Sequence, residues 1–212
     1  MSLDWAVVVP VKGRAQGKSR LDVAPSLREE LALAFALDAV RAALAAAGVR
    51  EVVVVTPRAD ALRFRDLGAG VVTEPASSGL LPALAAGGAA VRSRALGVAF
   101  LLGDLPALRP EQLAAALTAA GRVPRAIVPD ADGRGTVLST ARPGVQHRPR
   151  FGTGSRLAHR RAGYVELALR DVSGLRRDVD TLADLGAARQ RGVGLFTARA
   201  LQALGPRTGQ SG

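Results

Sequence analysis

Residues 7–20 read VVVPVKGRAQGKSR, an apolar run that ends abruptly in a loop of glycines and cations. Both lysines of the chain, Lys12 and Lys18, lie in this loop, whereas the other 27 basic residues are arginines. An ammonium group is a compact point charge, so Lys and Arg are not interchangeable where a charge must reach a phosphate. A buried strand followed by a glycine loop with lysines is typical of a phosphate-binding loop. The alternative is that two surface lysines have been retained by chance.

Similar apolar runs recur along the chain and alternate with helical patterns. Strands are predicted at residues 5–11, 51–56, 71–72, 97–102, 126–129, 137–140 and 165–169. Helices are predicted from Pro25 to about Gly48 (with Ser26 and Glu29 as a capping box), over 59–67, from the 74–81 loop to about Arg94, from Pro110 to Gly121, around His159, and from Thr181 to about Gly192, where the last helix ends.

This alternation predicts an α/β fold with a mostly parallel central sheet that helices cover on both faces. The pattern changes after Pro129, where a tight turn and a short strand predict a small antiparallel extension. The length of 212 residues fits a single domain over residues 1–200. Residues 205–212 are polar and rich in glycine, and we expect them to be a disordered tail.

Composition excludes several classes of protein. The net charge of +11 is compatible with a polyanion partner, but the arginines are dispersed and only seven residues are Phe, Trp or Tyr, so we expect no nucleic-acid partner. Cysteine is absent, which excludes disulfides and thiolate metal sites. No apolar run approaches the roughly 20 residues that span a membrane, and Asp4 stands where a signal peptide would be basic. We therefore expect a cytoplasmic protein with no membrane partner.

Three acidic residues follow predicted strands. Asp104 comes just after the run at 97–102, and Asp178 and Asp180 can point both carboxylates to one side of an extended segment. Ligands of open parallel sheets bind at the carboxyl ends of strands. Carboxylates and lysines gathered there suit a Mg²⁺–nucleotide site. The structural alternatives are a turn or helix cap at Asp104 and a favourable helix dipole beside Asp178 and Asp180.

A P-loop kinase is a less favoured interpretation of the lysine loop. Gly13 to Ser19 resembles a Walker A motif that is one residue short, with Lys12 where the first glycine belongs. That motif requires a helix directly after the Lys-Ser pair, but Pro25 marks the helix start several residues later.

A second glycine loop, FGTGS at residues 151–155, stands at a predicted helix start, where backbone N–H groups favour an anion. Thr136 can add a hydroxyl from its own glycine turn. Gly152 and Gly154 can instead serve loop geometry alone. His159 is interpreted as a surface or packing residue, or as a residue that helps hold the same anion.

With these motifs assembled, the chain resembles the guanylyltransferases of coenzyme F-420 biosynthesis, relatives of the nucleotidyltransferases that activate molybdopterin and sugar phosphates. The matching segments extend from about residue 6 to residue 190: VPVKGRAQGKSRL, GDLPAL, PDADGRGTVLS, FGTGSRLAH and RDVDTLADL. The resemblance implies a Rossmann-related, nucleotide-diphospho-sugar transferase-like fold. It also implies that the antiparallel extension binds the acceptor substrate.

The resemblance implies a reaction in which GTP condenses with phosphoenolpyruvate to give enolpyruvoyl-2-diphospho-5'-guanosine and pyrophosphate. The alternatives are 2-phospho-L-lactate, 3-phosphoglycerate, a pterin or a sugar phosphate as acceptor. The implied roles by position are nucleotide binding at Lys12, Gly13, Lys18, Glu74 and Gly79, catalysis at Lys12, Lys18 and Asp104, Mg²⁺ binding at Asp104, Asp178 and Asp180, and phospho-acid binding at Thr136, Gly152 and Ser155. Arg134 and Val137 depart from the small or polar residues expected beside Thr136.

Overall fold

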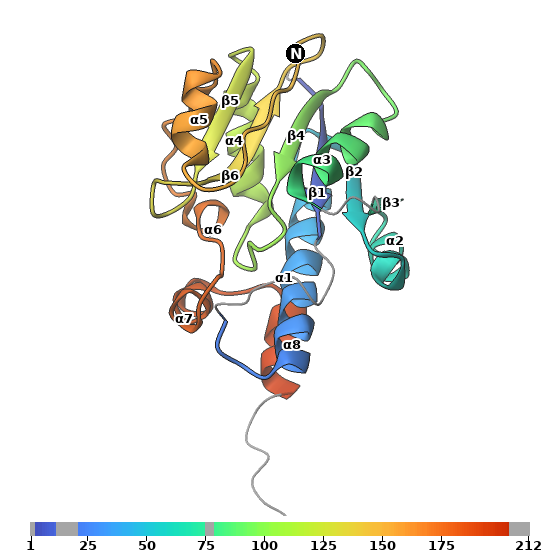
Figure 1. The fold of residues 1–212 in the computed structure, drawn as a ribbon, viewed down its shortest axis with the longest axis vertical. Helices are drawn as coiled ribbons and strands as arrows, with labels where there is room; N and C mark the ends of the chain where they lie inside the picture. The colour runs from blue at the N-terminus through green and yellow to red at the C-terminus, as the bar shows by residue number, and fades with distance from the viewer. Residues whose placement is uncertain (1–2, 12–20, 75–78, 204–212) are drawn as a thin grey trace, which may run out of the picture.

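The strand that precedes the lysine loop is an interior strand of the sheet. The computed structural model describes residues 3–11, 21–74 and 79–203, and within them seven strands form one sheet in the order β3-β2-β1-β4-β6-β5-β7 (Figure 1). The strands are β1 (Trp5–Pro10), β2 (Val49–Thr56), β3 (Gly70–Thr73), β4 (Gly97–Leu101), β5 (Arg125–Pro129), β6 (Thr136–Ala141) and β7 (Val165–Glu166).

The sheet is parallel except at one strand. β1 pairs in parallel with β2 and β4, β2 with β3, and β5 with β7, whereas β6 runs antiparallel to both β4 and β5. All six residues of β1 are buried, as a central parallel strand requires, because helices cover both of its faces. The predicted fold class, including the antiparallel extension after Pro129, is confirmed.

Helices cover both faces of the sheet. They are α1 (Pro25–Ala45), the short 3-10 helix η2 (Arg58–Asp60), α2 (Ala61–Asp66), α3 (Leu80–Ala89), α4 (Pro110–Ala120), α5 (Ser155–Arg161), α6 (Ser173–Arg176), α7 (Leu182–Arg191) and α8 (Leu195–Ala203). Val7 and Val9 point into the larger core cluster with α1 and α4, and Val8 points into the opposite cluster with α3. Figure 1 shows α3 in front of the sheet and α1 behind it.

Helix α8 was not predicted, because the helix that begins after Thr181 was expected to be the last one. α8 packs against α1. Asp38, which is 5% exposed in the middle of α1, accepts hydrogen bonds from the backbone N–H groups of Phe196 (3.0 Å) and Thr197 (2.8 Å). Burial raises the pKa of the Asp38 carboxyl, and the hydrogen bonds from Thr197 and Phe196 oppose that rise. A buried carboxylate thus supplies partners for the first turn of α8.

Two local expectations need correction. The predicted capping box of Ser26 and Glu29 is wrong, because α1 begins at Pro25, so that Ala24 holds the cap position, with no side-chain cap hydrogen bond. Pro25 occupies the first helical turn, where its missing N–H is no loss. The strand predicted at 165–169 is limited to the two residues of β7. Within the described residues, we find no helix with the length and apolar character needed to cross a membrane.

Candidate active site

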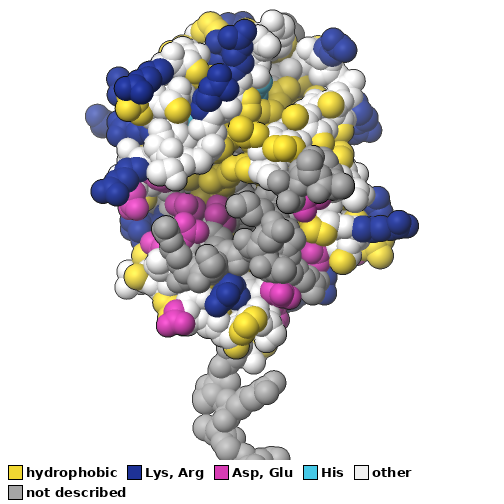
Figure 2. All heavy atoms as spheres, in the orientation of Figure 1, with side chains coloured by type: hydrophobic (Ala, Val, Ile, Leu, Met, Phe, Trp, Pro, Cys, Tyr) yellow, Lys and Arg dark blue, Asp and Glu magenta, His cyan; other side chains and the backbone are white. Residues whose placement is uncertain are grey.

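A cleft of about 720 Å³ opens at the carboxyl ends of the central strands. It collects residues from the ends of β1 and β4, from the turn before β6, from the loop before α5, and from the segment between α6 and α7; they include Pro10, Val11, Gly103, Asp104, Asp130, Arg134, Thr136, Gly152, Ser155, Arg177, Asp178, Asp180 and Asp184. Figure 2 shows acidic side chains around the middle of this face, beside a hydrophobic strip, with most of its basic side chains toward the rim. The cleft lies where open parallel sheets bind their ligands.

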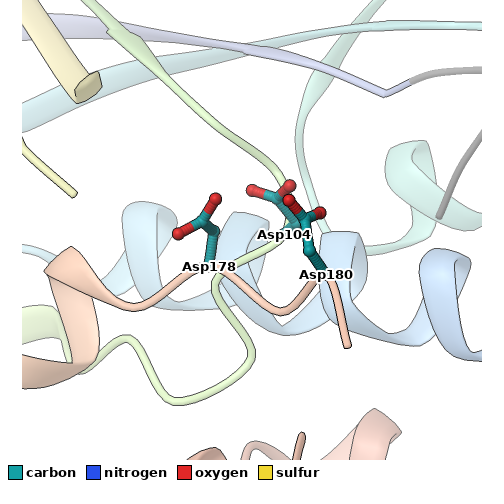
Figure 3. Close-up of side chains that lie close together, drawn as sticks. All are labelled: Asp104, Asp178 and Asp180. Carbon is teal, nitrogen blue, oxygen red and sulfur yellow. The ribbon is translucent and has the colours of Figure 1, made fainter. Parts of the chain in front are cut away.

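Three of the predicted acidic residues meet in this cleft. Ligand oxygens of Asp104, Asp178 and Asp180 all lie within 4.8 Å of one another, and all three residues are half-buried. The three side chains point toward one another from two chain segments (Figure 3). The sequence thus correctly anticipated that these carboxylates are neighbours, although their role as metal ligands stays a prediction.

One backbone hydrogen bond brings the two segments together. The N–H of Val179 donates to the carbonyl oxygen of Asp104 over 3.1 Å. Val179 is fully buried in a cluster with Phe35 and Leu31 of α1. Because side chains alternate along an extended segment, the inward direction of Val179 turns both Asp178 and Asp180 outward into the cleft.

The chain after Asp180 is fixed by the cap of α7. Thr181 and Asp184 form the reciprocal capping box, with the Thr181 N–H donating to the Asp184 carboxylate over 2.9 Å and the Asp184 N–H donating to Thr181 Oγ1 over 3.2 Å. Burial would raise the pKa of Asp184, but the hydrogen bonds from Thr181 and Asp180 outweigh it and the pKa is lowered. This confirms the helix start predicted at Thr181.

The donor set of the three aspartates fits a hard divalent cation. Each residue offers a carboxylate oxygen, and oxygen ligands from two or three carboxylates with open positions are typical of Mg²⁺ and Mn²⁺ sites. No nitrogen or sulfur ligand belongs to this group of described residues. The cluster can therefore bind a divalent metal ion.

The turn before β6 is held by the carboxylate of Asp130, which accepts from the N–H groups of Arg134 (2.9 Å) and Gly135 (2.6 Å). A Cβ at Gly135 would overlap Asp130 Oδ2, so any other residue there would displace the carboxylate that holds the turn. The Arg176 guanidinium donates to the carbonyl oxygens of Pro129 and Asp130, which attaches α6 to the same turn. These contacts fix the turn so that Thr136, the first residue of β6, lies in the cleft wall.

The second glycine loop forms another wall of the cleft. Gly152 (φ 127°) and Gly154 (φ 71°) adopt backbone conformations that favour glycine, and Ser155 is buried at the first position of α5. Arg156 holds this helix by a bidentate ion pair with Glu166 (2.8 Å for each contact) and by a hydrogen bond to the carbonyl oxygen of Gly133. Thr136, Gly152 and Ser155 therefore line the same cleft as the three aspartates.

His159 is fully buried, so the expectation of a surface residue is wrong and the packing alternative is closer. Its Nδ1 lies 2.9 Å from the Ser155 carbonyl oxygen and 3.1 Å from Thr136 Oγ1, and its Nε2 lies 2.8 Å from the Arg150 backbone nitrogen. Burial lowers its pKa to about 4, so the imidazole is neutral at pH 7. The helical spacing of Ser155 and His159 was the only sequence signal for this connection.

The other residues singled out in the sequence differ in their relation to the cleft. Val137, one of the two departures noted beside Thr136, is a fully buried core residue, whereas Arg134 is exposed on the cleft wall. Glu74 and Gly79 belong to the part of the chain that the structure describes, but they do not line the cleft. Lys12, Gly13 and Lys18 lie outside the described residues. Residues 21–24 are not helical and α1 begins at Pro25, which argues against a Walker A motif ending at Ser19.

Comparison with known proteins agrees with this geometry. Residues 30–191 match the MobA-like NTP transferase domain. The chain is 51% identical over 209 residues to a phosphoenolpyruvate guanylyltransferase of Streptomyces avermitilis, which covers 95% of this chain and 96% of the relative. It is 52% identical to the enzyme of that name from Streptomyces coelicolor, over 92% of this chain and 95% of the relative.

Solved structures show the same fold at low identity. A candidate nucleotide-diphospho-sugar transferase from Desulfovibrio desulfuricans G20 superposes with a TM-score of 0.69 at 20% identity and covers 95% of each chain. A Mycobacterium tuberculosis protein in complex with manganese superposes with a TM-score of 0.56 at 23% identity, over 90% of this chain and 100% of the other.

Proposed function

We propose, from the premise that this chain belongs to the phosphoenolpyruvate guanylyltransferase family of MobA-like NTP transferases, that it condenses GTP with phosphoenolpyruvate in coenzyme F-420 biosynthesis. One observation carries the proposal: the cleft gathers three clustered carboxylates and a separate polar wall of Thr136, Gly152 and Ser155. The first group suits a metal-bound triphosphate, and the second suits the phosphate of a small acid.

In the proposed reaction, a phosphate oxygen of phosphoenolpyruvate attacks the α-phosphorus of GTP. The bond between the α-phosphorus and its bridging oxygen to the β-phosphate breaks, and pyrophosphate leaves with that electron pair. The attacking phosphate is already an anion, so the protein needs to position it and to neutralise charge rather than to remove a proton. Thr136, Gly152 and Ser155 hold the acid in this scheme, and no covalent enzyme intermediate is needed.

Asp104, Asp178 and Asp180 would hold Mg²⁺, since their donor set is all oxygen. When bound, the ion would supply positive charge that lowers the repulsion between two polyanionic substrates. Lys12 and Lys18 are proposed to offset charge on the triphosphate, with Gly13 in the same loop, and Glu74 and Gly79 are proposed to approach the nucleoside. These five assignments rest on the resemblance of the sequence. We further propose that the reaction takes place in the cytoplasm.

A substrate panel tests the proposal. Purified protein with Mg²⁺ is given ATP, CTP, GTP or UTP, each with phosphoenolpyruvate, 2-phospho-L-lactate, 3-phosphoglycerate or a sugar phosphate, and pyrophosphate release is measured. We expect GTP with phosphoenolpyruvate to give the highest kcat/KM. The diphosphate ester should appear in equal amount by mass spectrometry. Faster turnover of CTP or UTP with a sugar phosphate would overturn the proposal, and faster turnover with another three-carbon acid would correct the acceptor.

A further inference from the structure

We propose that His159 is the positioning residue of the phospho-acid site, because one neutral imidazole connects all three parts of the chain that form that site. This inference rests on the proposed function. Nε2 contacts the backbone of Arg150, two residues before Gly152, while Nδ1 contacts both the carbonyl of Ser155 and the hydroxyl of Thr136.

The contacts determine which nitrogen of the ring carries the proton. The Arg150 backbone N–H can only donate, so Nε2 must accept and carries no hydrogen. The hydrogen of the neutral ring is therefore on Nδ1. From there it points at the Ser155 carbonyl oxygen, which can only accept. Both backbone contacts require the same tautomer.

This tautomer orients the hydroxyl of Thr136. Since Nδ1 bears a hydrogen, Thr136 Oγ1 faces it as an acceptor over 3.1 Å and cannot donate to it. The hydroxyl hydrogen of Thr136 is thus directed away from His159. Thr136 is 3% exposed, yet it lines the cleft, so a phosphate oxygen there can accept this hydrogen. His159 thereby keeps Thr136 a donor, as an anionic ligand needs.

The surroundings keep the ring neutral and fixed. Phe151 and Tyr164 contact it edge-on, with ring centroids 5.3 Å and 4.9 Å away. Arg150 disfavours a second proton, in addition to the effect of burial. A charged imidazolium would add a hydrogen at Nε2 and lose the Arg150 contact, so the loop before Gly152 depends on the neutral form.

Two substitutions test the contacts of Nδ1 and of Nε2 separately. The amide of His159→Asn lies near the Nδ1 position and can still donate to Ser155 and Thr136, whereas that of His159→Gln lies near the Nε2 position and can only replace the Arg150 contact. With GTP saturating, we expect His159→Gln to raise the KM for phosphoenolpyruvate about tenfold, the effect of one hydrogen bond. We expect His159→Asn to restore it to within about threefold, and the KM for GTP to stay within about twofold in both.

A double-mutant cycle asks whether His159 acts through Thr136. If it does, Thr136→Val should weaken phosphoenolpyruvate binding far less in the His159→Gln background than in the wild type. Multiplicative effects would show a merely structural role and overturn the inference. His147→Gln is the control, since His147 is half-buried in the same aromatic cluster but contacts Ser139 instead. It should leave both KM values unchanged.

The tautomer itself is measured on the wild-type protein by the ¹⁵N chemical shifts of the histidine rings, whether or not a variant folds. An Nε2-protonated His159 would overturn the inference. Unchanged KM for phosphoenolpyruvate in a folded His159→Gln variant, with normal wild-type turnover, would also overturn it while leaving the proposed function intact. Absence of wild-type turnover with every phospho-acid would instead defeat the proposed function.

Discussion

Asp104 illustrates how far a single residue can be understood from its neighbours. Its carbonyl oxygen holds the Val179 backbone, while its carboxylate joins the cluster with Asp178 and Asp180. The backbone contact has a structural role, and the side chain has the proposed chemical one. A substitution that changes only the carboxylate can therefore separate the two.

We predict that Asp104→Asn lowers kcat by about 1000-fold or more, because a metal ion contributes several kcal/mol of charge stabilisation in the transition state. The fold should be preserved, since the amide has the same shape and the Val179 hydrogen bond uses the backbone. Steady-state kinetics and the circular dichroism spectrum check both points. The control is Asp66→Asn, an exposed aspartate of α2 outside the cleft, which should keep normal turnover. Near-normal activity of Asp104→Asn would contradict the metal assignment.

At the scale of residues, the sequence located carboxylates better than it located their supports. Asp104 could be found because it follows a predicted strand whose carboxyl end lies at the ligand-binding edge of the sheet. Asp178 and Asp180 could be found because they alternate along an extended stretch just before the helix predicted from Thr181. The contact of His159 with Arg150 could not be found, because it depends on a loop, 142–150, that has no periodic pattern. That loop is fixed by contacts with distant residues, among them Arg148 with the Tyr164 hydroxyl and Arg150 with His159.

At the scale of elements, α1 and α8 pack against each other, but only α1 was predicted from the sequence. The middle of α1 is buried on almost every side, from Leu31 to Ala43. A helix that is apolar all round needs cover on both sides, so the pattern of α1 already implied a second partner besides the sheet. Neither Asp38 nor the sequence around Phe196 revealed where that partner is, since one acidic residue in a helix is usually solvated.

We predict that Asp38→Ala lowers the free energy of unfolding by about 2–3 kcal/mol, because two charge-assisted hydrogen bonds to the first turn of α8 are lost. Intrinsic helix propensity alone predicts the opposite sign, since alanine is the better helix former. Urea unfolding gives the difference. The matched variant Asp66→Ala lies on the exposed side of α2 and should change stability by less than about 0.5 kcal/mol. An unchanged or higher stability of Asp38→Ala would mean that α8 does not depend on this carboxylate.

At the scale of the whole molecule, the class of fold followed from the alternation of strands and helices, and the order of the strands did not. Local patterns report which segments are extended, but the antiparallel insertion of β6 between β4 and β5 is set by long-range packing. The prediction of the helices after β7 was incomplete for a similar reason, since α6 and α8 were not predicted. α6 has only four residues, too few for a periodic pattern to appear.

The two histidines give the whole molecule a predictable response to acid. Burial lowers the pKa of His147 to about 3 and that of His159 to about 4, whereas both titrate near 6.5 in the unfolded chain. Below pH 6.5 the unfolded state therefore binds more protons, so stability is highest above this pH and falls as the pH falls. Near pH 5 the two groups together lower the free energy of unfolding by about 2.5 kcal/mol for each unit by which the pH falls.

Urea unfolding between pH 6.5 and 4.5 checks this response in the wild type and in His147→Gln. The variant removes one of the two titrations, so its slope near pH 5 should be smaller by about 1.3 kcal/mol per pH unit. Carboxyl groups such as Asp38 titrate in both proteins and cancel in the comparison. Equal slopes would show that His147 is not buried in its neutral form.

The hydrogen bond from Val179 to Asp104 also has a consequence for biosynthesis. A nascent polypeptide that has emerged through β6 contains all the residues of β1 to β6, but it still lacks two of the three aspartates of the proposed ion site. The proposed ion site would thus be complete only after translation has passed Asp180. A chain released before that point would lack Asp178 or Asp180, and the proposed ion site would be incomplete even if the sheet had formed.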